Sequence, residues 1–242
     1  MRELIRLEQR KNTLSTYLKM SAWVTVGVVA MTWTIALSAG SEPPGSEEAA
    51  LMSSYIGLAN LAAVISMAAF CVLSAAMHAK FTVEEYSGNR AVLTLSCPAP
   101  RKKVLAAKVV LVSGFTLVAA ALSSLASLAV FLLTEAVFPV VHGPLEPHMI
   151  IPMAADVVVM SLLAVALGLI GLAAGFLKRS TPVTIIAAII AAALLSSLAS
   201  NLAKGDGGHA LPIVAVTAIA AIAAAFALTR WISGTVESME AA

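Results

Sequence analysis

The chain has 242 residues, of which 60% are hydrophobic and only 12% are charged; its mean hydropathy is +0.95 and its net charge is +2. A soluble globular domain carries about 25% charged residues, so this composition excludes a soluble domain and is typical of a polytopic membrane protein. The two cysteines do not suggest a disulfide framework, because Cys71 lies in an apolar stretch and Cys97 in a predicted cytoplasmic loop.

The N-terminal segment, residues 1–19, is predicted to form an amphipathic helix that lies on the inner face of the membrane. Its leucines fall within a narrow arc at helical spacing, and basic and polar residues occupy much of the opposite side. The apolar residues would enter the acyl boundary while the basic ones would meet anionic headgroups. An ordinary basic flank before the first span explains the same residues equally well, and both interpretations stay open.

Six apolar stretches follow, each about long enough to cross a bilayer as a helix. They cover residues 20–39, 52–77, 109–134, 150–177, 183–203 and 211–230. The connections on the outer side are short and rich in proline or glycine. The predicted fold class is therefore an all-α membrane protein, with one transmembrane domain over residues 20–242 that follows the interfacial helix.

The basic residues are distributed very unevenly around these stretches. With the N-terminus inside, 14 of the 15 Lys and Arg residues fall on one side of the membrane, and only Lys204 lies on the other. Basic loops are retained in the cytoplasm. The sequence thus predicts a multi-pass protein of the cytoplasmic membrane with both termini in the cytoplasm.

The fourth apolar stretch contains three glycines. Gly171 and Gly175 form a G-x-x-x-G pair, which lets two helix backbones approach closely. Two outcomes are compatible with this motif, namely tight packing within one chain and an interface between two subunits.

The longest predicted cytoplasmic connection, residues 79–108, carries a distinctive pattern. Acidic residues come first, a glycine and a short apolar patch follow, and prolines and basic residues lead into the third span. Proline ends a helix, so the pattern predicts a short helix parallel to the membrane that is bracketed by turns. Such an element would offer a compact surface to a cytoplasmic partner, whereas a solvated connector is the simpler alternative.

This loop resembles that of the permeases of ABC-2-type transporters, in particular the small bacterial members that serve in bacteriocin or lantibiotic immunity and in drug efflux. The residues that carry the resemblance are Glu84, Glu85, Gly88, Leu93, Leu95, Ser96, Pro98, Arg101 and Lys108. The N-terminal segment over residues 4–11 is also similar to the start of these proteins. The motif covers about 25 residues, while the likeness in architecture extends over the whole chain.

The resemblance implies six spans, a dimer with the same or a related permease, and a coupling helix at about residues 83–95 that rests on a separate ATPase. The implied ATPase-coupling residues are Glu84, Glu85, Tyr86, Gly88, Arg90 and Leu93. ATP and Mg²⁺ would belong to that partner, because this sequence has no G-x-x-x-x-G-K-[ST] phosphate loop. The chain itself would be no enzyme and would hold no cofactor. It would export or extract a hydrophobic or amphipathic compound, such as an antimicrobial peptide, an antibiotic or a lipid-like molecule.

Few other polar residues suggest a site. Asp156 lies inside the fourth apolar stretch and is a possible intramembrane polar site, although a structural role explains it as well. Glu135, at the end of the third stretch, is predicted to be solvated. The four histidines lie in separate loops or at span ends without ligand spacing, so neither a metal site nor a catalytic residue is predicted. The basic loops are explained by membrane topology and not by nucleic-acid binding.

Two other functions stay open at this point. A membrane sensor or docking subunit that transports nothing would use the same cytoplasmic loop. An ion-driven secondary transporter would need a titratable path, for which Asp156 is the one candidate singled out.

Overall fold

The computed structural model describes residues 14–38, 54–86, 101–135, 149–178 and 180–203, together with the isolated helical positions Ile219, Ala223 and Ala227. Every secondary-structure element in these ranges is helical, which confirms the predicted all-α class for this part of the chain. The elements are the α-helices α2 (Leu14–Ser38), α4 (Tyr55–His78), α6 (Arg101–Glu135), α7 (Ile150–Lys178) and α8 (Thr181–Ala203), the π-helix η2 (Ala79–Val83) and the 3-10 helix η3 (Glu84–Tyr86).

Four of the described helices are long and apolar enough to cross a membrane. They cover Leu14–Ser38, Tyr55–Val83, Lys103–Glu135 and Ile150–Lys178. The fifth predicted span is also helical, and its described side chains form an apolar helix over Thr181–Ser197. The sixth, residues 211–230, lies outside the described residues apart from the three isolated positions.

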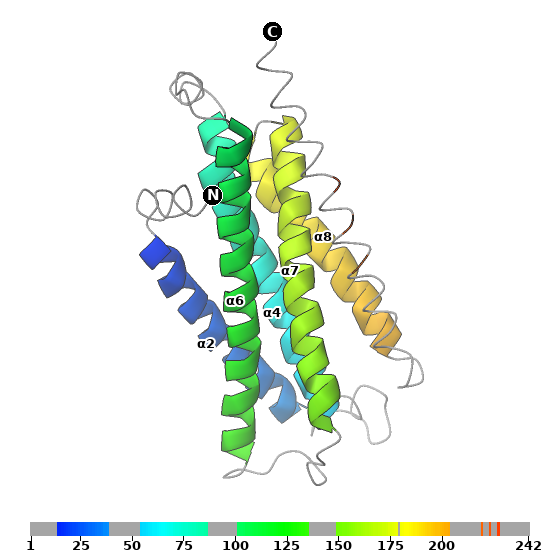
Figure 1. Ribbon diagram of the computed structural model, residues 1–242. Coiled ribbons are helices and arrows are strands. Elements are labelled where there is room, and N and C mark those ends of the chain that lie inside the picture. The colour runs from blue at the N-terminus through cyan, green and yellow to red at the C-terminus, as the bar shows by residue number, and fades with distance from the viewer. Residues whose placement is uncertain are drawn as a thin grey trace.

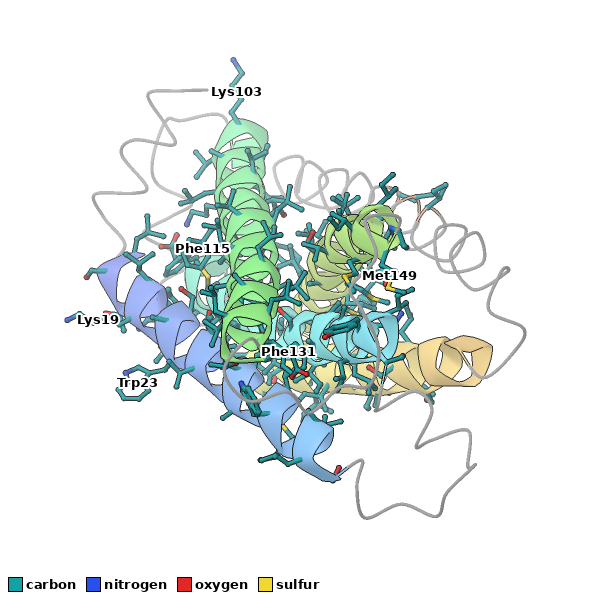
Figure 2. All side chains as sticks on the ribbon, turned by 90° about the horizontal axis from the view of Figure 1, so that it is seen from below. Lys19, Trp23, Lys103, Phe115, Phe131 and Met149 are labelled. Carbon is teal, nitrogen blue, oxygen red and sulfur yellow. The ribbon has the colours of Figure 1, made fainter. Side chains whose placement is uncertain are left out.

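The helices pack around α4, which contacts α2, α6, α7 and α8 (Figure 1). In the view from below, α4 lies between the other four (Figure 2). Its sequence explains this position, because alanine, serine and glycine recur on all its sides and let neighbours approach closely. In the most apolar part of the span Tyr55–Val83, which contains α4, 56% of the residues are buried, compared with 22% in α2. Trp23 of α2 points away from the bundle in Figure 2.

Helices that follow one another in the chain alternate in direction, so that α4 ends where α6 begins, and α7 ends where α8 begins, all at the top of Figure 1. The seven Lys and Arg residues of the described ranges all lie near these helix ends or near the start of α2. They are Lys19, Lys80, Arg101, Lys102, Lys103, Lys108 and Lys178. We call this the basic end of the bundle. The fold therefore gathers the basic residues that are dispersed along the chain.

Three helix boundaries differ from the predicted ones. The first helix begins at Leu14, so it includes the last residues of the predicted interfacial helix, of which residues 1–13 lie outside the described ranges. The second helix, predicted to end at residue 77, continues as η2 and η3 to Tyr86. The third begins at Arg101 and not at residue 109. Lysine, alanine and leucine are good helix formers, so backbone hydrogen bonding extends beyond the apolar residues that mark a span.

The glycines of α7 mark close approaches within the chain. A Cβ atom at Gly171 would lie 2.8 Å from the Thr184 carbonyl oxygen, and one at Gly175 would collide with the Thr184 hydroxyl. Both glycines thus face α8, while Gly168 faces Ser74 of α4. Of the two outcomes left open by the G-x-x-x-G motif, the structure shows tight packing within one chain.

Replacing Gly175 with leucine is expected to destabilise the protein by about 1–3 kcal/mol, the usual cost of overpacking a close contact, because α7 and α8 must separate. Thermal unfolding in detergent, followed by loss of the monodisperse peak in size-exclusion chromatography, measures the effect. Gly114→Leu is the matched control, since a Cβ at Gly114 meets nothing within 4 Å. Equal loss of stability in both variants would contradict the packing role of Gly175.

Candidate functional site

The helix that ends the second span changes its winding at the basic end of the bundle. From Ala79 to Val83 it is a π-helix, in which the backbone N–H of Glu84 bonds to the Ala79 carbonyl oxygen. A single π-helical turn is rare, and such turns are frequent at functional sites. Four of the five residues of this turn are buried, namely Ala79, Phe81, Thr82 and Val83. The start of the predicted coupling loop is therefore part of the packed bundle and not a free connector.

Lys108 connects this turn to α6. Its side chain is only 1% exposed. Its Nζ donates a hydrogen bond of 2.9 Å to the Phe81 carbonyl oxygen and a second bond to the Glu85 carboxylate, with which it forms an ion pair. A lysine is almost never fully buried without a partner, since desolvation of its charge is costly. We call this arrangement of Lys108, Glu85 and the Phe81 carbonyl the Lys108 clamp.

Apolar side chains of α2, α6 and α7 pack against the π-helical turn that belongs to the clamp. Tyr17 of α2 meets Phe81 edge to face, with ring centroids 5.2 Å apart. On another side, Val83 packs in one cluster with Leu105 of α6 and Leu172 of α7. The low dielectric of such surroundings strengthens the attraction between Lys108 and Glu85 and makes an unpaired charge there expensive.

A buried histidine, His78, directly precedes the π-helix, and the sequence alone did not single it out as a site residue. His78 is fully buried, and neither ring nitrogen has a hydrogen-bond partner among the described residues. The hydroxyls of Ser74 and Thr82, four residues before and after it, are likewise buried without a partner in the described ranges. These three polar residues are spaced four apart in the sequence, and this helical spacing could have predicted that they lie on one face of the helix.

The structure places the predicted coupling residues only in part. Glu84 and Glu85 form the 3-10 turn and are both half-buried, and Glu85 belongs to the clamp. Tyr86 closes that turn. Gly88, Arg90 and Leu93 lie outside the described residues. The implied coupling helix covers about residues 83–95; of these, Val83 is 2% exposed, because the helical packing of α4 continues through it.

A second polar pair lies towards the opposite end of the bundle. The Asp156 side chain is 5% exposed, and Asn60 Nδ2 donates a hydrogen bond to its Oδ2 at 3.5 Å. Asp156 belongs to the second turn of α7 and Asn60 to the second turn of α4, so their contact joins these two helices. Glu135, predicted to be solvated, is only 6% exposed. That prediction was wrong because the last turn of α6 packs beside α4, where Leu58 and Phe131 share a cluster.

Comparison with known proteins adds a relative but no activity. No family model and no solved structure matches this chain. The chain is similar to the uncharacterized protein YcbO of Bacillus subtilis (strain 168), with 27% identity over 198 residues, which cover 80% of this chain and 83% of YcbO. Because YcbO is itself uncharacterized, the similarity assigns no substrate, partner or reaction.

Proposed function

We propose that the chain is the membrane-spanning permease subunit of an ATP-driven exporter of the ABC-2 type in a bacterial cytoplasmic membrane. The ATPase is a separate polypeptide that holds ATP and Mg²⁺, and the substrate is a hydrophobic or amphipathic compound. A second permease, of the same or a related sequence, completes the membrane part. The proposal takes its family from the resemblance at residues 84–108 and its mechanics from the Lys108 clamp.

The observation that carries the proposal is the position of the clamp. Residues 87–100 connect η3 to α6, and the clamp ties the two ends of this connection together through Glu85 and Lys108. A force applied to the connection therefore reaches α4 and α6 together. A free connector would instead absorb the movement in its own backbone.

The path of such a force follows from the packing. Lys108 is hydrogen-bonded to the carbonyl oxygen of Phe81, which belongs to the π-helical turn that continues α4. The helix α4 in turn contacts every other long helix of the described ranges. Packed helices move as rigid bodies, because interiors at crystal-like density do not deform continuously. When the proposed ATPase closes on ATP, the displacement of its docking surface shifts α4 against α7 and α8, and this opens a path for the substrate. The clustered basic residues hold the docking end at the cytoplasmic face.

The proposal is tested by purifying the tagged full-length chain from its native membrane in mild detergent and identifying its companions by mass spectrometry. We expect a polypeptide with a phosphate loop in stoichiometric amount. The same preparation shows whether one or two kinds of permease are present. An ATPase that is retained by the wild type but lost on deletion of residues 87–100 would place the docking surface on that connection.

An intact chain that purifies without any ATPase from several detergents would contradict the exporter. A kinase or regulator in its place would favour the sensor or docking subunit. Transport driven by an ion gradient in vesicles that contain only this chain would favour a secondary transporter instead.

A further inference from the structure

The pair formed by Asp156 and Asn60 is unusual for its depth and for its lack of a balancing charge. Among the described residues Asp156 forms no ion pair, and Asn60 is its hydrogen-bond partner. The basic residues of the described ranges lie at the other end of the bundle. Removing a carboxylate from water costs at least several kcal/mol unless another charge compensates for it. A neutral amide at 3.5 Å compensates for only a small part of that cost.

The depth of the pair matches the membrane interface. The 29 residues of α7 span about 43 Å at 1.5 Å per residue, whereas the hydrocarbon core of a bilayer is about 30 Å thick. For a helix centred in the bilayer, Asp156 lies about 9 Å from its start and therefore close to the edge of the hydrocarbon core. The charged group of an amphipathic molecule in a leaflet takes up this depth, while its apolar part lies deeper.

The chemistry of the pair is that of a cation acceptor. An ionised carboxylate only accepts hydrogen bonds, and an amide that donates through its nitrogen still has a carbonyl oxygen free to accept. An ammonium group has three N–H donors and a positive charge, so it can donate to the carboxylate and to the amide oxygen and also balance the negative charge. Asn60 is half-buried, so the pair is not sealed within the bundle. Towards the middle of the bundle, α7 continues with apolar residues such as Val157 and Met160, which disfavour deeper polar contacts.

We propose that Asp156 and Asn60 form a binding site for the positively charged group of an amphipathic amine. Binding itself requires only this chain. That the amine is the exported compound rests on the proposed function, of which this inference names the substrate class.

Binding is measured by fluorescence polarisation with the full-length chain in lipid nanodiscs, without any ATPase, against empty nanodiscs as background. The probe is monodansylcadaverine, an amphipathic primary amine, and its N-acetylated form is the neutral control. We expect the chain to bind the amine more tightly than the acetylated form. Asp156→Asn is expected to weaken amine binding about tenfold, which corresponds to about 1.4 kcal/mol, and to leave binding of the acetylated form unchanged.

Three further variants separate the site from general charge or folding effects. Asp156→Glu retains the charge and is expected to retain most of the preference for the amine. Asn60→Val retains Asp156 and is expected to weaken amine binding by a smaller factor, which keeps the proposal testable if Asp156→Asn fails to fold. Glu135→Gln removes another buried carboxylate near the same end and is expected to leave amine binding unchanged.

Equal affinity of wild type and Asp156→Asn for the amine would overturn the proposal, as would equal affinity of the wild type for the amine and its acetylated form. Lys204 of this chain, which follows the end of α8, is the rival counter-charge. If Lys204→Met strengthens amine binding, that lysine occupies the site and the proposal falls. Because no ATPase enters this assay, its outcome is independent of the co-purification that tests the exporter.

Discussion

Replacing Lys108 with methionine is expected to destabilise the protein by about 3 kcal/mol, the low end for removing one partner of a buried ion pair. The variant leaves the Glu85 carboxylate without its charge partner and the Phe81 carbonyl without its donor, while methionine fills a similar volume. The value is at the low end because Glu85 is 15% exposed and water screens part of the lost interaction. Thermal unfolding of the purified chain in detergent measures the change.

Two controls connect that loss to the clamp. Lys103→Met removes an exposed lysine of the same helix, which projects from the end of α6 in Figure 2, and is expected to change stability little. The double variant Lys108→Met with Glu85→Gln removes both charges and is expected to recover part of the stability, because no unpaired charge remains. If Lys108→Met behaves like Lys103→Met, the clamp contributes nothing to the fold.

Replacing Glu84 with alanine is expected to reduce transport roughly tenfold while the chain stays in the membrane with its ATPase bound, an effect equal to losing one interface contact of about 1.4 kcal/mol. The expectation follows from the proposed function, in which Glu84 is one of the polar contacts to the ATPase. Transport in vesicles and ATP hydrolysis are measured on the same preparation, and the rate of hydrolysis is expected to stay near that of the wild type while the rate of transport falls.

The single substitution Glu84→Ala tests the coupling role more specifically than the replacement of both glutamates does. Losing Glu85 also breaks the clamp, so a transport defect in the double variant could arise from local unfolding. Glu84→Ala leaves the Lys108–Glu85 pair in place, and its thermal stability serves as the internal control. Normal transport by a stable Glu84→Ala protein would remove Glu84 from the coupling contacts.

The sequence by itself determined the features that depend on local composition. Apolar stretches of sufficient length must be helical in a bilayer, where each backbone polar group needs a partner within its own segment, and four of the predicted spans correspond to span-length helices. The Gly171–Gly175 pair likewise predicted a close helix approach, because only a missing side chain permits it. The predicted helix ends were less accurate than the predicted spans, because hydropathy shows which part of a helix is apolar and not where its backbone hydrogen bonding stops.

Only the tertiary structure decided which polar residues meet. Lys108 and Glu85 are 23 residues apart, and Asn60 and Asp156 are 96 residues apart, so no local pattern relates either pair. The sequence placed Lys108 among the basic residues that lead into the third span, and its burial follows only from the structure, in which α6 begins at Arg101 and passes beside the π-helical end of α4. The tertiary structure also decided that α8 is the helix that packs against the glycines of α7, since a glycine motif shows that two helices approach but not which two. Packing around α4 settled these pairings, because burial of one charge requires a partner from another helix.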